Sequence, residues 1–332
     1  MDKETKNLLN IIDNFSQKEI AVWGDLILDE YIFGDTRRIS REAPVLILSY
    51  QSKELSLGGA GNSILNLKSL GAEPVPVGII GADDSGNKIK NMLQKKGIST
   101  KYIIVDKNYQ TPIKTRILAG EGHTRKQQIL RIDRETKVPE DSILKQKIKQ
   151  NLKSVRDSFA LLISDYNYFS VKEDVFKQIL PLFRKANVPV TLDSRFRLLN
   201  FQGITAATPN EPEVEEALRI KINDNPDILK KAGRIILRKI QSTALLITRG
   251  SKGMMLFEKD KTPFSIPIQG TTDIVDVTGA GDTVISVLTL ALACGASFRQ
   301  AAQLANYAGG IVVMKKGTAT ITPLELQKTI SS

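Results

Sequence analysis

The alternation of short apolar runs with longer amphipathic stretches is the feature that most constrains the fold of this chain. The short runs are β-branched or aliphatic and end in polar or turn residues, which is typical of strands. They are Ile20–Trp23, Leu161–Ser164, Val188–Leu192, Ala206–Thr208 and Ala244–Thr248. The longer stretches have helical spacing and are Gly61–Leu70, Gly86–Lys96, Ser142–Val155, Val171–Ala186, Asn225–Ile240, Thr283–Cys294 and Phe298–Met314. This order predicts an α/β fold whose mainly parallel sheet is covered by helices on both faces.

Polar residues follow several of the predicted strands directly. They are Gly24-Asp25, Ser164-Asp165, Asp193 and Asn210. Ligands of open parallel sheets bind beyond the carboxyl ends of the strands, where the loops leave a crevice. We therefore expect the functional site at this edge of the sheet.

Two segments depart from the alternating pattern. Tyr31–Gln51 and Gln110–Asp133 are rich in Arg, Ile, Leu and Thr and lack helical periodicity. We expect them to pair into a small sheet that stands off the main body and serves as a lid over the site. No linker-like tract interrupts the chain, so we expect one domain over residues 1–332, with the lid formed by about 31–51 and 110–133.

Composition excludes several classes of function. The net charge is +11, but the basic residues are spread along the chain without interleaved aromatic residues, which argues against a nucleic-acid partner. No run reaches the roughly 18 apolar residues that span a membrane. The absence of a signal-like N-terminus and the single cysteine, Cys294, favour a cytoplasmic protein. The single histidine, His123, excludes a histidine-rich metal site.

The strongest local signal is Asp276-Val277-Thr278-Gly279-Ala280-Gly281-Asp282, which precedes an apolar helical run. Small residues let the backbone approach a ligand, and a helix start offers unpaired N–H groups and a positive dipole end to a phosphate. Asp282 could then accept a proton from an attacking hydroxyl during phosphoryl transfer. The competing interpretation is that Asp282 only caps the helix. The segment taken alone leaves both interpretations open.

Four motifs in a fixed order carry a family resemblance. They are Gly58–Asn62, Thr208–Glu213, Thr248–Gly253 and Asp276–Asp282. Together they resemble the ribokinase-like, or PfkB, carbohydrate kinase family over about residues 20 to 325. The resemblance implies a three-layer sandwich with a small β lid, the phosphorylation of a sugar by ATP with Mg²⁺, and a homodimer formed through the lid.

Further segments resemble one branch of that family, the D-glycero-β-D-manno-heptose-7-phosphate kinases of bacterial lipopolysaccharide synthesis. These segments are Gly24–Tyr31, Arg38–Val45, Gln127–Asp133, Ser164–Tyr166 and Lys316–Thr320. The resemblance implies conversion of the heptose 7-phosphate to the 1,7-bisphosphate. In many bacteria such a kinase is fused to a nucleotidyltransferase, and this chain is expected to represent the kinase half alone.

The resemblance also implies a role for each matching residue. The base would be Asp282, and the anion hole would comprise Gly279, Ala280 and Gly281. The nucleotide side would comprise Asn210, Glu213, Thr248, Gly250 and Gly253, with Glu213 holding Mg²⁺ through water. Sugar hydroxyls would contact Asp25, Asp29, Gly58, Gly59 and Asn62. The existing phosphate would contact Arg38, Lys114 and Arg116, for which a solvated surface charge is the competing interpretation.

Three departures from the pattern of these heptose kinases bear on specificity. Asn167–Ser170 replaces a segment that usually contains Lys-Gly, Asp193-Ser194-Arg195 replaces Asp-Pro-Lys, and Arg41 replaces a proline. A kinase for another sugar or sugar phosphate is therefore an open alternative. A sugar- or nucleotide-binding protein without activity is a further alternative, which the intact Asp276–Asp282 segment disfavours.

Overall fold

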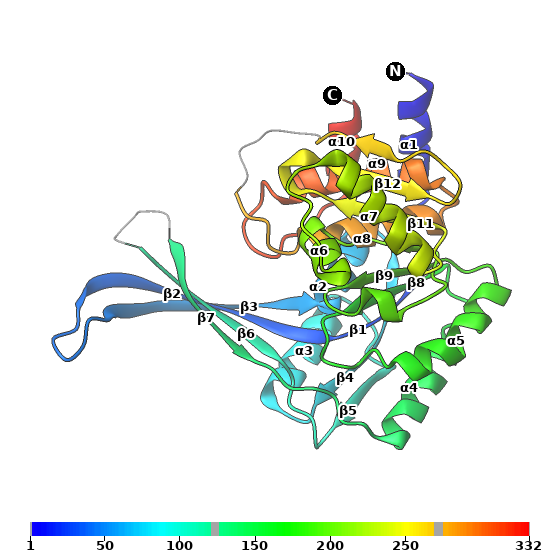
Figure 1. Ribbon diagram of the computed structural model, residues 1–332. Helices are drawn as coiled ribbons and strands as arrows, with labels where there is room; N and C mark the ends of the chain where they lie inside the picture. Colours follow the sequence, from blue (N-terminus) through cyan, green and yellow to red (C-terminus); the bar gives the residue numbers. More distant parts are fainter. Residues whose placement is uncertain (1, 121–125, 269–274, 332) are drawn as a thin grey trace.

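A nine-stranded, mainly parallel sheet forms the centre of the protein in the computed structural model, which describes residues 2–120, 126–268 and 275–331 (Figure 1). The strand order is β13-β12-β11-β10-β9-β8-β1-β4-β5. The strands are β1 (Glu19–Gly24), β4 (Glu73–Gly81), β5 (Ile103–Asp106), β8 (Ala160–Asp165), β9 (Val190–Ser194), β10 (Ala206–Ala207), β11 (Ala244–Thr248), β12 (Met254–Glu258) and β13 (Phe264–Ile266). Strands β11 to β5 are parallel, whereas β12 and β13 are antiparallel at one edge. The predicted α/β fold with a mainly parallel sheet is confirmed.

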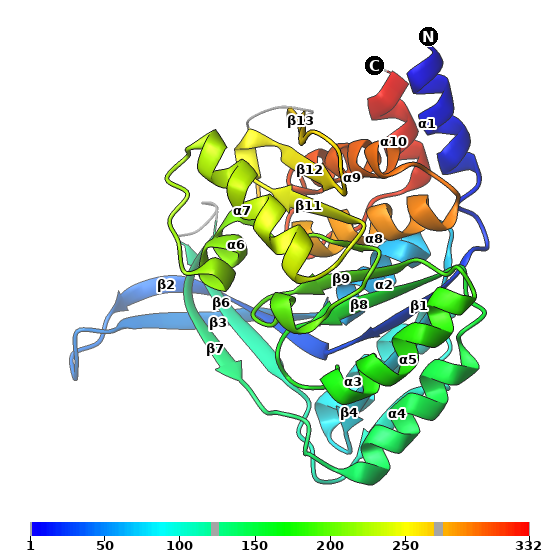
Figure 2. The same ribbon diagram turned by 45° about the vertical axis from the view of Figure 1, so that its right-hand side comes forward.

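Helices cover both faces of this sheet, because successive side chains of a strand point to opposite faces. In β1, Ile20 and Val22 belong to one buried apolar cluster, and Ala21 and Trp23 belong to the other. The first cluster contains side chains of α1 (Lys3–Asp13), α2 (Ala60–Ser69), α3 (Asp84–Lys95), α8 (Ala280–Ala293), α9 (Phe298–Val312) and α10 (Pro323–Ser331). The second contains side chains of α4 (Ser142–Ser154), α5 (Glu173–Lys185), α6 (Glu211–Leu218) and α7 (Pro226–Lys239). Figure 2 shows α8 and α9 on one side of the sheet and α5 on the other.

A second, four-stranded sheet projects from this body as a twisted arm (Figure 1). Its order is β3-β2-β6-β7, and its strands are β2 (Leu26–Ile39), β3 (Leu46–Gly59), β6 (Ile113–Gly120) and β7 (Gln127–Arg134). The central pair β2 and β6 is parallel, and the two outer pairs are antiparallel. The two extended segments therefore form the predicted small sheet. The side chain of Arg38 and residues 121–125, which include His123, lie outside the described residues.

Helix α8 carries the sequence segment of greatest interest into the interior. Its residues from Asp282 to Ala291 are all buried, which is expected of a helix that is apolar on every side. Helices α2 and α9 pack against it. The start of α8 is therefore fixed by core packing at the edge where the strands end.

Among the described residues, no helix combines the length and the apolar character needed to cross a membrane.

Candidate active site

A cavity of about 490 Å³ lies where the four-stranded sheet meets the carboxyl ends of the central strands. Residues from β2, β6 and β7 line one side, and residues that end or follow β8, β9, β10 and β11 line another. The start of α8 closes the remainder with Val277, Thr278, Gly279, Gly281 and Asp282. This cavity therefore lies at the predicted location beyond the strand ends.

Gly279 and Gly281, at the start of α8, differ in what surrounds their Cα atoms. Gly279 has φ of 78°, a left-handed conformation, and an added Cβ would clash with the side-chain amide of Asn62. Gly281 lies in the first turn of the helix, and an added Cβ would meet no atom within 4 Å. The backbone at Gly281 therefore borders open space in the cavity. Unpaired N–H groups at such a helix start suit an anionic ligand.

Asp282 is not the cap of α8. Gly279 occupies the capping position, without a side-chain hydrogen bond, and Asp282 is the third residue of the helix. Its Oδ2 accepts a hydrogen bond from Asn62 Nδ2 at 2.8 Å, and its Oδ1 accepts one from the Tyr166 hydroxyl at 3.1 Å. Burial raises the pKa of Asp282 to about 6, although both hydrogen bonds lower it. The capping interpretation is therefore wrong, and the side chain is an oriented carboxylate that is mainly ionised at pH 7.

Asp25 does not line the cavity, although the sequence predicts a substrate contact there. Its Oδ2 accepts hydrogen bonds from the backbone N–H groups of Tyr166 and Tyr168 at 2.8 and 3.1 Å, and its Oδ1 accepts one from Ser170 at 2.9 Å. Burial, followed by the nearby charge of Asp165, raises the pKa of Asp25 to about 6. The carboxylate is thus occupied in holding the loop that follows β8.

The other predicted sugar contacts divide between the cavity and its support. Asp29 lines the cavity, where its Oδ1 accepts a hydrogen bond from Arg116 Nη1 at 2.7 Å. Gly59 also lines it, whereas a Cβ at Gly58 would clash with the Asp29 carboxylate. Asn62 lies behind the lining and holds Asp282. Two of the four therefore line the cavity, and the other two pack against groups that line it.

Four cationic side chains line the cavity: Lys114, Arg116, Arg131 and Arg195. The sequence analysis singled out the first two and missed the others. Arg131 lies in a segment that resembles the heptose kinases, and Arg195 lies in a segment that departs from their pattern. Arg131 pairs with Asp133 in β7. Lys114 is buried with its ammonium 4.9 Å from the centre of the Tyr166 ring, and among the described residues it has no hydrogen bond or ion pair. Burial, followed by repulsion from Arg195, lowers its pKa.

Asn210 and Glu213 form a capping box at the start of α6. Asn210 Oδ1 accepts from the N–H of Glu213, and Glu213 Oε2 accepts from the N–H of Asn210, each at 2.9 Å. Helix capping explains this motif locally, and both residues also line the cavity. Burial raises the pKa of Glu213 to about 7, and burial together with Glu213 raises that of the neighbouring Asp193 well above its ordinary value. Two carboxyl groups that face the same space thus repel each other when both are charged.

A narrow apolar slot of about 150 Å³ adjoins this cavity and shares Thr248, Val277 and Gly281 with it. Gly250 and Gly253, the other residues predicted for the nucleotide side, line the slot. A Cβ at Gly253 would clash with the backbone of Ile266, so glycine is required for the close approach of these strands. The slot offers a flat, largely apolar ligand group a path to the start of α8.

Comparisons with known proteins agree with this geometry. Residues 17–325 match the family described as pfkB family carbohydrate kinase. The chain belongs to this family. It is similar to the Bifunctional protein HldE of Pelobacter propionicus, with 36% identity over 97% of this chain and 65% of that protein. It is also similar to the Bifunctional protein HldE of Haemophilus influenzae, with 39% identity over 95% of this chain and 64% of that protein.

Solved structures establish the ribokinase-like fold of this pfkB carbohydrate kinase. The ribokinase of Arabidopsis thaliana, solved with ribose and ATP, is 20% identical and has a TM-score of 0.73 over 96% of this chain and 99% of that chain. Phosphofructokinase-2 from Escherichia coli, solved with fructose-6-phosphate, is 17% identical and has a TM-score of 0.75 over 95% and 98%. Family membership identifies the protein as a sugar kinase. The chain spans about two thirds of the length of the curated relatives that it matches.

Proposed function

We propose that this pfkB kinase transfers the γ-phosphoryl group of ATP to D-glycero-β-D-manno-heptose 7-phosphate and forms the 1,7-bisphosphate. The observation that carries the proposal is the pairing of a buried, oriented Asp282 with four cationic side chains in one cavity. The first suits the deprotonation of a hydroxyl, and the second suits a phosphate that the acceptor already carries. The heptose is chosen because the segments around Asp29 and Arg131 resemble those of heptose-phosphate kinases.

In the proposed reaction, Asp282 is the general base. The acceptor hydroxyl gives its proton to the Asp282 carboxylate while its oxygen forms a bond to the γ-phosphorus. The bond between the γ-phosphorus and the bridging oxygen breaks, and ADP leaves with the electron pair. The N–H groups of Gly279 and Gly281 are the proposed donors to the negative charge on the transferring group, aided by the helix dipole. The N–H of Ala280, which the sequence also predicted for the anion hole, donates instead to the Val277 carbonyl at 3.2 Å. Asp282 then returns its proton to solvent.

The nucleotide is proposed to occupy the apolar slot and to extend its phosphates toward the start of α8. Gly250 and Gly253 border the slot, and Thr248 borders both the slot and the main cavity. Mg²⁺ is commonly bound by one or two carboxylates together with substrate phosphates and water, and the neighbouring Asp193 and Glu213 fit this requirement. When bound there, the ion would neutralise charge on the phosphates.

The cationic side chains are proposed to distinguish a phosphorylated acceptor from a neutral sugar. Lys114 has no ion pair among the described residues, and burial together with repulsion from Arg195 lowers its pKa, although the charges of Asp29 and Asp133 raise it. An added phosphate would offset this cost, because charge-assisted hydrogen bonds are strong in a partly buried site. Arg195 faces the same space and is a further candidate contact. Arg116 is held by Asp29 and would act with it on the sugar.

An acceptor panel tests the proposal directly. Purified protein is incubated with ATP–Mg²⁺ and the heptose 7-phosphate, the unphosphorylated heptose, or pentose and ketohexose phosphates, and kcat/KM is compared. We expect the heptose 7-phosphate to be preferred and the bisphosphate to appear by ³¹P NMR. Preference for another sugar phosphate would assign the chain to the alternative acceptor class, which the altered Asn167–Ser170 loop beside the site favours.

The base is tested by Asp282→Asn. We expect kcat to fall about 10²–10⁴-fold, because a general base typically contributes that factor, while ATP binding measured by calorimetry is retained. Near-normal turnover by the variant would remove Asp282 from this role.

A further inference from the structure

We infer that Tyr166 is the positioning residue of the base Asp282, and that the buried Asp25 carboxylate holds Tyr166 in place through the backbone of residues 166–170. This inference rests on the proposed function, because it gives Asp282 the role of base. It assigns a task to Asp25, which does not line the cavity, and to a loop whose sequence departs from that of the heptose kinases.

The Asp282 carboxylate has a different donor on each oxygen. Asn62 donates to Oδ2 from α2, and Tyr166 donates to Oδ1 from the loop after β8. Asn62 is itself held by Asn66, whose Nδ2 donates to the Asn62 backbone carbonyl at 3.0 Å. With a donor on each oxygen, rotation of the carboxylate breaks at least one hydrogen bond. The carboxylate lines the cavity, where an acceptor hydroxyl would lie, and it has lone pairs left to accept a further hydrogen bond.

The loop that carries Tyr166 has an unusual backbone that converges on Asp25. Asn167 and Phe169 both have φ of 67°, a left-handed conformation that glycine adopts freely and other residues resist. This alternation points the N–H groups of Tyr166, Tyr168 and Ser170 at one carboxylate. Backbone N–H groups that converge in this way form a concave anion site. Here the anion is Asp25, so its charge compensates the strained backbone and fixes Tyr166.

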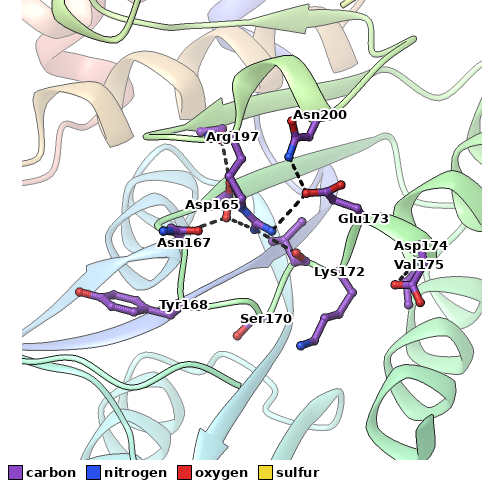
Figure 3. Close-up of polar contacts among 12 residues, drawn as sticks. Asp165, Asn167, Tyr168, Ser170, Lys172, Glu173, Asp174, Val175, Arg197 and Asn200 are labelled. Carbon is purple, nitrogen blue, oxygen red and sulfur yellow. Dashed lines mark hydrogen bonds and ion pairs between the residues drawn. The ribbon is translucent and has the colours of Figure 1, made fainter. Parts of the chain in front are cut away.

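Side chains hold the same loop from its other flank (Figure 3). Arg197 donates from Nε to Asp165 Oδ2 at 3.1 Å, and Asp165 Oδ1 accepts from the N–H of Asn167 at 3.1 Å. The Arg197 guanidinium also lies 4.6 Å from the centre of the Phe169 ring. The Lys114 ammonium covers the ring of Tyr166 itself. The phenol is thus restrained at its backbone, along its ring and at its hydroxyl.

The Tyr166 hydroxyl remains a donor under all working conditions. Burial, followed by the negative charge of Asp282, raises its pKa well above the ordinary value for tyrosine. A phenol that keeps its proton stabilises the ionised carboxylate and lowers the pKa of Asp282. Removing the hydroxyl should therefore disturb both the orientation of the base and the pH at which it becomes active.

The decisive experiment is the pH dependence of kcat/KM for Tyr166→Phe, with ATP–Mg²⁺ and the best acceptor of the panel. In the unchanged protein the acid limb is expected near pH 6, the pKa of Asp282. Loss of a hydrogen bond to the charged form should move the limb upward by about one pH unit. At a pH above the acid limbs of both proteins, kcat of Tyr166→Phe should still be about 10- to 100-fold lower than that of the unchanged protein, because the base is less well oriented.

Tyr168→Phe is the matched control. Its hydroxyl donates to Glu135 at 3.0 Å and its side chain does not line the cavity, so its acid limb should stay in place. An unmoved limb in Tyr166→Phe, or an equal shift in both variants, would overturn the role of Tyr166. Asp282→Asn separates the base role of Asp282 from the positioning role of Tyr166. If Asp282→Asn retains turnover, the base role is wrong. If Asp282→Asn is inactive but the acid limb of Tyr166→Phe does not move, only the positioning role is wrong.

The part played by Asp25 is tested with Asp25→Asn. The amide keeps the shape of the carboxylate but removes the charge that faces three N–H groups. We expect its acid limb to move in the same direction as that of Tyr166→Phe, in protein whose circular dichroism shows a native fold. A folded variant with the unchanged profile would remove Asp25 from the assignment. If the variant does not fold, the result for Tyr166→Phe still decides the positioning role.

Discussion

At the scale of single residues, the two glycines at the start of α8 carry separate requirements. Gly279 is required by its left-handed φ and by its packing on the Asn62 amide, which donates a hydrogen bond to Asp282. We expect Gly279→Ala to push Asn62 away from Asp282 and to lower kcat by about 100-fold, the effect of a misplacement of about 1 Å. Thermal unfolding should also occur at a lower temperature, because an alanine with positive φ is strained.

Gly281→Ala is the comparison that separates packing from ligand access. The added methyl meets no protein atom, and alanine favours a helix over glycine by about 1 kcal/mol, so thermal stability should be kept or raised. The methyl would nevertheless occupy the space proposed for the phosphates, and KM for ATP should rise. An unchanged KM for ATP would contradict a close approach of the nucleotide to this backbone.

Residue roles were only partly predictable from the sequence. A helix-start aspartate looks the same whether it caps the helix or serves as a base, because the difference lies in its partners. Those partners, Asn62 and Tyr166, are 220 and 116 residues from Asp282 in sequence. The same limit explains Asp25, which follows a strand as a ligand contact would but turns its carboxylate to a loop more than 140 residues away.

At the scale of elements, a buried ion pair joins the end of β8, at Asp165, to the turn after β9, at Arg197. Asp165 is fully buried, and Arg197 is 9% exposed and also donates to the Val171 carbonyl. Arg197→Ala would leave the carboxylate without its partner, and we expect the free energy of unfolding in urea to fall by about 3–5 kcal/mol. Lys261→Ala, which removes a surface pair with Glu258, should cost less than about 1 kcal/mol. Equal losses in the two variants would contradict the importance of burial.

Helices and strands were predicted correctly where the hydrophobic periodicity of the sequence is strong, and a strand was missed where prolines interrupt that periodicity. Strand β4 was not predicted, because Pro74 and Pro76 interrupt its pattern and proline cannot donate to a sheet. The structure accommodates both prolines because β5 pairs only with Gly78–Gly81, so the earlier part of β4 has a neighbour on the β1 side alone. A sequence gives no sign of where a neighbouring strand begins, and this omission was therefore unavoidable.

At the scale of the whole molecule, the four-stranded sheet has two faces of different character. Register places Asp29 beside Lys114, and Arg116 opposite Arg131, on the face that lines the cavity. Because side chains alternate, the opposite face carries apolar residues, among them Ile32, Ile117, Leu130 and Ile132. Leu130 and Ile132 are 52% and 54% exposed. An apolar face on a projecting sheet is typical of a surface that binds another molecule.

We propose that this outer face pairs with a second copy of the chain, as the family resemblance implies. Light scattering should then give twice the mass of 36.7 kDa, and Leu130→Glu should give a monomer, because a buried carboxylate at a two-fold contact would face its own copy. Ile143→Glu, at a residue of α4 that is 60% exposed, should leave the dimer intact. A monomer mass for the unchanged protein at all concentrations would contradict the pairing. Because one face carries the site and the other the contact, the Leu130→Glu monomer should bind ATP as the dimer does.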